Sequence, residues 1–343
     1  MSCSSDILRR TVLLLLFLLI PWTAQGKKII VKMATLAPDG SLWHQLLIDM
    51  GHRWHEATDG NVVLRIYPGG IAGDERDMIR KIRIGQIHAA AVTIEGLTEI
   101  SRDMNVFYIP MLVDSFEDLD TIRQALSPQL FAALKKGGFR VLSWADIGWA
   151  YWFTKEPIMV PKELRKLRIF TWAGDYYTAE LWKTAGFHPV PLSSVDILPS
   201  LQTGIIDAFS TTPLAALSFQ WFSLAPNMLD LKWGPIIGAI ILSDRIWNSI
   251  PPEYHEDIVR IGAEVESEAR SLVPEVENAL AVMGEHGLIV NHLKLEEREQ
   301  WVQLTTSFYP HIRGTLVPED IFDRAIELKN ELKETKALQS GEK

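Results

Sequence analysis

The chain has 343 residues, and its 34 basic and 43 acidic residues give it a formal net charge of -9 at pH 7. This acidic excess argues against nucleic acid or an anionic lipid surface as the main partner. A chain of this length exceeds what one hydrophobic core comfortably organises, so we expect two lobes with a cleft between them.

Residues 1–26 have the layout of a secretory signal peptide. Arg9 and Arg10 precede an apolar run that ends at Trp22, and a short stretch of small residues follows. The run is about a dozen residues long, shorter than the ~20 that a helix needs to span a bilayer. We therefore expect export, cleavage before Lys27 and a periplasmic mature chain. A retained membrane anchor is the alternative.

The remaining composition limits the chemistry of the mature protein. The single cysteine, Cys3, precedes the apolar run and is lost on cleavage, so neither a disulfide nor thiol chemistry is expected. The chain has 12 tryptophans, and all but Trp22 lie after the expected cleavage point. No second apolar stretch is long enough to cross a membrane.

Apolar periodicity predicts that the mature chain begins with alternating strands and helices. The predicted segments, in order, are the strand 28–33, the helix 42–57, the strand 62–67, the helix 74–84 and the strand 88–92. Ser41 is a suitable N-cap for the first helix, and Gly85 is a suitable stop for the second. This β-α-β-α-β order predicts a parallel sheet covered by helices on both faces.

The same alternation continues through the rest of the chain. Further strands are predicted at 140–144, 150–154, 167–170, 188–191, 206–210, 236–242 and 287–290. Helices are predicted from the Ser193–Ser194 cap to Gly204, over 252–283 with a possible kink at Pro274, and from Lys294 onward with a break at 314–318.

Four sequence blocks, in this order, carry a family resemblance. They are Tyr-Pro-Gly-Gly-Ile-Ala-Gly-Asp-Glu-Arg at 67–76 with the stretch 84–90, Phe-Tyr-Ile-Pro-Met-Leu at 107–112, Leu-Arg-Lys-Leu-Arg-Ile at 164–169, and Leu-Gln-Thr-Gly-Ile-Ile-Asp-Ala at 201–208. Their order and spacing resemble the DctP-type solute-binding proteins of TRAP transporters over nearly the whole mature chain.

The resemblance implies a fold, a function and partners. The fold is α/β, the two-lobed periplasmic-binding-protein fold (type II-like), with mixed, mostly parallel sheets flanked by helices, crossing strands and a long inter-lobe helix. Lobe 1 comprises 27–147 plus 238–283, and lobe 2 comprises 148–237 plus 284–343. The function is to capture an organic acid between the lobes and deliver it to the small and large integral membrane subunits of the transporter. No enzyme activity, cofactor or metal is expected.

The resemblance also suggests how the ligand carboxylate is bound. In this family an arginine of the third block usually holds that carboxylate, and Arg168 matches it. A guanidinium donates two parallel hydrogen bonds to a carboxylate and stays charged when buried. The alternative is a surface arginine in a basic run with Lys162, Arg165 and Lys166.

Two other positions depart from the family pattern. The stretch 148–153 lacks the second arginine that often faces the ligand, and Thr211 stands where an asparagine is often found. One arginine beside aromatic rings predicts a monocarboxylate with an apolar or aromatic body. The ring candidates for the cleft are Trp149, Tyr151, Trp172, Phe209 and also Trp233.

Other assignments stay open at this stage. Trp144 and Trp182 are interpreted as core residues, and Trp152 faces either the cleft or the core. Thr93 and the following turn 94–96 are expected to supply a hydroxyl and backbone donors to the ligand. The aromatic residues as a group could instead pack in the core or between the lobes.

Other residue groups could suggest a different function. His52 and His55 have a spacing that can hold a metal, but no third ligand is indicated. The carboxylates of Asp74 and Glu75 are explained by the dipole at a helix N-terminus. No nucleophile elbow or phosphate-binding glycine loop is present. A receptor of the same fold that serves a sensor or soluble partner, and an exported enzyme on this scaffold, remain as alternatives.

Overall fold

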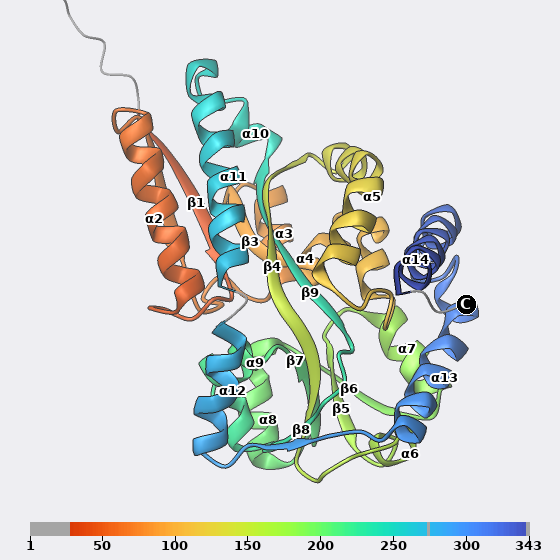
Figure 1. The fold of residues 1–343 in the computed structure, drawn as a ribbon. Coiled ribbons are helices and arrows are strands. Elements are labelled where there is room, and N and C mark those ends of the chain that lie inside the picture. The colour runs from red at the N-terminus through yellow and green to blue at the C-terminus, as the bar shows by residue number, and fades with distance from the viewer. Residues whose placement is uncertain (1–27, 273–274, 341–343) are drawn as a thin grey trace, which may run out of the picture.

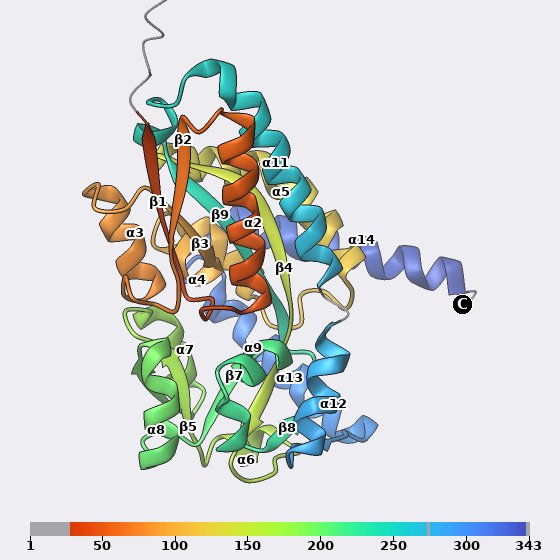
Figure 2. The same ribbon diagram turned by 90° about the vertical axis from the view of Figure 1, so that its left-hand side faces the viewer.

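A computed structural model describes residues 28–272 and 275–340, and the predicted signal peptide lies outside this range. The chain forms two α/β lobes, one above the other in Figures 1 and 2. Their strands belong to one ten-stranded sheet with the order β2-β1-β3-β9-β4-β7-β5-β6, to which β8 and β10 are attached. The predicted fold class is therefore confirmed.

The first lobe is built on a parallel set of strands. These are β1 (Ile29–Thr35), β2 (Val62–Tyr67) and β3 (Ala89–Thr93), with β9 (Gly234–Ser243) antiparallel beside β3. The helices α2 (Leu42–Ala57) and α11 (His255–Ser271) cover one face, and the other face carries α3 (Glu75–Arg83), α4 (Ile94–Thr98), η1 (Arg102–Tyr108) and α5 (Phe116–Lys136). Side chains alternate along β1, so Met33 packs on the face covered by α2 and α11 and Ala34 packs on the opposite face.

The second lobe repeats this layered plan. Its strands are β5 (Arg168–Trp172), β6 (His188–Leu192), β7 (Ala208–Thr211), β8 (Asn227–Leu229) and β10 (Ile289–Asn291). The helices α6 (Pro161–Leu164), α7 (Tyr176–Thr184) and α13 (Leu295–Ile312) lie toward one side, and η2 (Ser194–Asp196), α8 (Ile197–Thr203), α9 (Pro213–Ser218) and α12 (Glu275–Glu285) lie toward the other.

One long strand, β4 (Phe139–Thr154), runs through both lobes. The sequence predicted two separate strands here, but a single strand pairs with β9 above and with β7 and β8 below. Its pairing with β9 is interrupted between Val141 and Ser143 and between Asp146 and Gly148. These β-bulges add local bend without ending the strand, and Gly148 has φ 136, a conformation that favours glycine.

The helical segment predicted over 252–283 is divided between the lobes. It contains α11, which packs on β4 and α2, and α12, which packs on α9. The predicted break before Pro318 is confirmed, since α13 ends at Ile312 and α14 (Glu319–Ser340) follows it. The boundaries of the lobes stay a prediction. We propose that α12 belongs to lobe 2 and that α14, which packs on α5, belongs to lobe 1.

Several helices were not predicted from the sequence, and α5 and α7 are the longest of them. Ser115 and Asp175 cap them, each side chain accepting a hydrogen bond from a backbone N–H of the first turn. Among the described residues, no helix combines the length and the apolar character needed to cross a bilayer.

Candidate functional site

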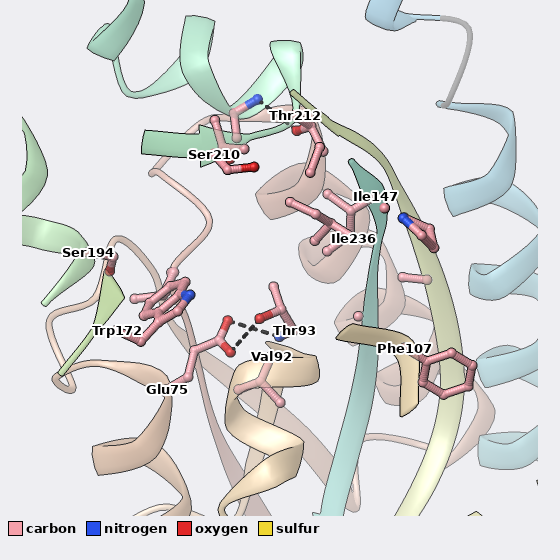
Figure 3. Close-up of a pocket in the computed structure, with 18 of the residues that line it drawn as sticks. Glu75, Val92, Thr93, Phe107, Ile147, Trp172, Ser194, Ser210, Thr212 and Ile236 are labelled. Atoms are coloured by element: carbon pink, nitrogen blue, oxygen red, sulfur yellow. Dashed lines mark hydrogen bonds between the residues drawn. The ribbon is translucent and has the colours of Figure 1, made fainter. Parts of the chain in front are cut away.

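A cavity of about 350 Å³ lies between the lobes, along the crossing strands β4 and β9. The carboxyl ends of two parallel strand pairs, one pair from each lobe, meet at it, with Thr35 and Thr93 as the last residues of β1 and β3 and Trp172 and Thr211 as the last residues of β5 and β7. In α/β sheets, ligands bind outside this edge of the strands. Figure 3 shows Trp172 and Thr93 facing the same space from opposite lobes.

The cavity wall is mostly apolar and aromatic. Phe170 and Trp172 contribute rings from β5, and Trp221 and Trp233 add further rings from the second lobe. Ile147 and Ile236 contribute aliphatic side chains from the crossing strands. Such a wall buries the apolar body of a solute and leaves orientation to a few polar groups.

The charges at the cavity are acidic. Within the described part of the chain, no lysine, arginine or histidine lines the cavity, whereas Glu75 and Asp175 do. A buried anion is costly unless a counter-charge or hydrogen-bond donors compensate it. The cavity therefore disfavours ligands with several negative charges.

Glu75 joins α3 to the start of α4. Its carboxylate accepts hydrogen bonds from the backbone N–H groups of Thr93 and Gly96, both at 2.9 Å, and from the Thr93 hydroxyl at 2.8 Å. Burial raises the pKa of Glu75 to about 7, although these hydrogen bonds act in the opposite direction. The Thr93 hydroxyl is thus already used within the protein.

A second buried carboxylate lies next to Glu75. Burial raises the pKa of Glu95 to about 8, opposed by the guanidinium of Arg76. Arg76 also donates to Glu99 at 3.1 Å. The nearest arginine to this acidic side of the cavity is therefore already paired with carboxylates.

Asp74 links the two lobes. It caps α3 by accepting from the N–H of Glu75, and it also accepts from the Ser193 hydroxyl at 2.9 Å and from the N–H and hydroxyl of Ser194 at 3.0 and 3.2 Å. Nearby, the guanidinium of Arg102 lies 5.4 Å from the ring centre of Tyr177. These contacts hold the lobes together beside the cavity.

The structure places Arg168 away from the cavity. It stands at the amino end of β5, its side chain is half exposed, and both Nε and Nη2 donate to Asp207 at 2.8 Å. Arg168 is not among the residues that line the cavity, because the carboxyl end of β5, and not its amino end, reaches it, and its role in ligand binding stays a prediction. Phe170 and Trp172, farther along the same face of the strand, line the cavity instead.

The other predicted residues divide into two groups. Trp172, Thr211, Thr93 and Trp233 line the cavity. Trp149, Tyr151 and Phe209 do not. Trp149 packs against Phe116 with ring centres 5.2 Å apart, and Phe209 stacks on Phe153 in the core with centres 5.3 Å apart. Whether any of these residues binds a ligand stays a prediction.

Several cavity residues were missed or assigned another role. Trp144, Trp152 and Trp182 are buried core residues that also reach the cavity wall. Asp74 and Glu75 were attributed to a helix dipole, but each accepts hydrogen bonds from other elements. In the sequence, only the position of Asp74 and Glu75 inside the first family block, 67–76, indicated that they belong to the site.

Comparison with known proteins supports the family resemblance that the four sequence blocks indicate. The model of the family "Bacterial extracellular solute-binding protein, family 7" (DctP) matches residues 33–314. The C4-dicarboxylate-binding periplasmic protein DctP of Vibrio cholerae is 23% identical over 256 residues, covering 73% of this chain and 76% of the relative. The 2,3-diketo-L-gulonate-binding periplasmic protein YiaO of Escherichia coli is 24% identical over 224 residues, covering 64% and 67%.

Solved structures show the same fold. A TRAP periplasmic solute-binding protein of Ralstonia eutropha with bound (S)-2-acetolactate has a TM-score of 0.81 at 20% identity, covering 89% of this chain and 99% of that chain. DctP7 of Bordetella pertussis, which binds pyroglutamic acid, has a TM-score of 0.80 at 16% identity, covering 88% and 99%. With the family model matching most of its length, the chain belongs to the DctP family of bacterial extracellular solute-binding proteins.

Proposed function

We propose that this protein is the periplasmic receptor subunit of a TRAP transporter and that it captures an organic acid with one carboxyl group and a large apolar body. The observation that carries the proposal is the aromatic cavity, which is lined by no lysine, arginine or histidine of the part of the chain that the structure describes. The protein with the acid bound then docks on the small and large membrane subunits of the transporter.

The acid class is supported by the relatives. The compared structures contain acetolactate and pyroglutamic acid, and another, from Sulfurospirillum deleyianum, contains succinate. All three ligands carry at least one carboxyl group.

The apolar body is supported by the cavity wall. A ring system or a branched chain placed between Trp172 and Ile236 would bury most of its surface against aromatic and aliphatic side chains. Burial of apolar surface contributes about 25 cal/mol per Å² before the costs of association. A small, strongly hydroxylated acid would gain little there.

The limit to one carboxyl group follows from the charges. A single carboxylate can be bound by neutral donors, and the hydroxyl of Thr211 lies at the cavity edge where strand ends converge. A second carboxylate would be buried near Glu75 and Asp175, where the guanidinium of Arg76 is already paired with Glu95 and Glu99. We therefore expect dicarboxylates and uronates to bind weakly.

Thermal unfolding of the purified mature protein with a panel of acids tests the proposal. Phenylpropanoate and cyclohexaneacetate represent the expected class, and succinate and D-glucuronate are the matched controls. At a concentration of 100 times Kd, a ligand stabilises by about 2.7 kcal/mol, which raises the unfolding midpoint of a protein of this size by about 4 °C. Stronger stabilisation by succinate or D-glucuronate than by every apolar acid would contradict the proposal.

A further inference from the structure

Four buried polar side-chain atoms without hydrogen-bond partners lie together in the second lobe. They are Nε1 of Trp152, Oγ1 of Thr171, Oγ1 of Thr178 and Oγ of Ser210. All four residues line the cavity. Native proteins pair most of their buried polar groups, so four unpaired groups gathered at one cavity point to a bound group.

The sheet register puts three of these residues in one row. Trp152 on β4 is the direct partner of Ser210 on β7. On the other side of β7, Ala208 pairs with Ile169 of the parallel strand β5, so Thr171 lies beside Ser210 two residues farther on. Directly paired residues of neighbouring strands project from the same face of a sheet.

Helix α7 brings the fourth residue to this row. The ring of Trp182 on α7 meets that of Trp152 edge to face, with centres 5.7 Å apart. Thr178 precedes Trp182 by four residues and therefore lies on the same face of the helix. We call the residues Trp152, Thr171, Thr178 and Ser210 the unpaired corner.

The unpaired corner offers donors and acceptors but no positive charge. The indole N–H of Trp152 only donates, whereas each hydroxyl donates or accepts, since its hydrogen turns about the Cβ–O bond. Asp175, which also lines the cavity, accepts from the N–H of Thr178 at 3.2 Å. A negatively charged group there would lie near the Asp175 carboxylate, and the guanidinium of Arg76 is already paired with Glu95 and Glu99, so an uncharged oxygen fits the corner best.

We propose that the unpaired corner is a subsite for an uncharged oxygen of the solute, a hydroxyl or a ketone, separate from its carboxyl group. The indole of Trp152 donates to this oxygen, and the hydroxyls of Thr171, Thr178 and Ser210 complete its hydrogen bonds. The inference rests on the proposed function and narrows its solute class to hydroxy or keto acids with an apolar body.

Paired probes that differ by one oxygen test the subsite. The acids are cyclohexaneacetate, 4-hydroxycyclohexaneacetate and 4-oxocyclohexaneacetate, and their affinities are measured by titration calorimetry with the mature protein. Of 4-hydroxycyclohexaneacetate and 4-oxocyclohexaneacetate, we expect the tighter ligand to bind at least about tenfold more tightly than the parent acid, cyclohexaneacetate. Its extra oxygen pairs with the polar groups of the corner, which the parent acid leaves unpaired. In Thr171→Val/Ser210→Ala this advantage should fall below about threefold while the affinity for the parent is kept.

Ser223→Ala is the control. The Ser223 hydroxyl is exposed, donates to Gln220 O at 2.8 Å and does not line the cavity. The advantage of the oxygenated acid should persist in this variant. Loss of the advantage in Ser223→Ala, or its persistence in the double variant, would overturn the assignment of the subsite.

The two proposals fail in different ways. Equal binding of all three acids contradicts the subsite and leaves the proposed function standing. A further uncharged pair, 4-ethylphenol and ethylbenzene, tests the corner without a carboxyl group. One outcome is that 4-ethylphenol stabilises the protein while ethylbenzene and the acids do not, and that this stabilisation is lost in Thr171→Val/Ser210→Ala. This outcome supports the subsite and contradicts the acid class.

Discussion

The hydrogen bonds from Ser193 and Ser194 to Asp74 should control how long a solute stays bound. The variant Ser193→Ala/Ser194→Ala removes two hydroxyl donors, at 2.9 and 3.2 Å from the Asp74 carboxylate, and it keeps the Ser194 N–H and the cap on α3. Hydrogen bonds to a charged group contribute about 1.5–3 kcal/mol each, and partial exposure reduces this. We therefore assign about 2 kcal/mol to the pair, a factor of ~30 in the equilibrium between closed and open lobes.

The solute dissociation rate, followed by tryptophan fluorescence in a stopped-flow instrument, measures this effect. If the lobes open before the solute leaves, the rate should rise about 30-fold, and the affinity should weaken by up to the same factor. Ser249→Ala, which removes an exposed hydroxyl bonded to Ile246 O in the first lobe, is the control and should change neither value. A dissociation rate within about threefold of the unaltered protein would refute the role of these bonds.

Three further outcomes follow from the site. Arg168→Ala should leave solute affinity unchanged, because this side chain is paired with Asp207 outside the cavity, and a large loss of affinity in calorimetry would restore its predicted role. Trp172→Ala should weaken binding of an apolar acid by about 10- to 100-fold, the loss of roughly 1.5–3 kcal/mol of buried ring contact, and an unchanged Kd would remove Trp172 from the site. Burial raises the pKa of Glu75 from 4.5 to about 7, so between these pH values the folded protein keeps a proton that the unfolded chain releases. The free energy of unfolding should therefore fall by about 3 kcal/mol as the pH rises through this range. Glu75→Gln should flatten the fall of the unfolding midpoint between these pH values, and equal slopes for variant and unaltered protein would contradict the pKa shift.

The layered α/β fold was predictable because its signals are local. The apolar periodicity of α2 and the caps at Ser41 and Gly204 lie within a few residues of the structures they specify. The long strand β4 was predicted as two pieces because Asp146 and Gly148 interrupt the apolar pattern there. A bulge keeps the strand continuous, and only its pairing with β9 shows this.

The site was less predictable because it depends on which end of each strand reaches the cavity. Arg168 and Trp172 are four residues apart in one strand, yet only Trp172 lies at the carboxyl end and lines the cavity. The unpaired corner needs the register of three strands and the face of α7, which no local pattern encodes. Thr211 lines the cavity because it stands at the carboxyl end of β7, and its contact with a ligand stays a prediction.

The shared strand β4 has a consequence for the cooperativity of folding. Because β4 and β9 pair in the first lobe and β4 pairs with β7 in the second, the hydrogen-bonded ladder of one lobe continues into that of the other. Neither lobe is encoded by one uninterrupted stretch of chain, and neither keeps a complete sheet when the other is removed. The two lobes should therefore melt together, as a single calorimetric transition.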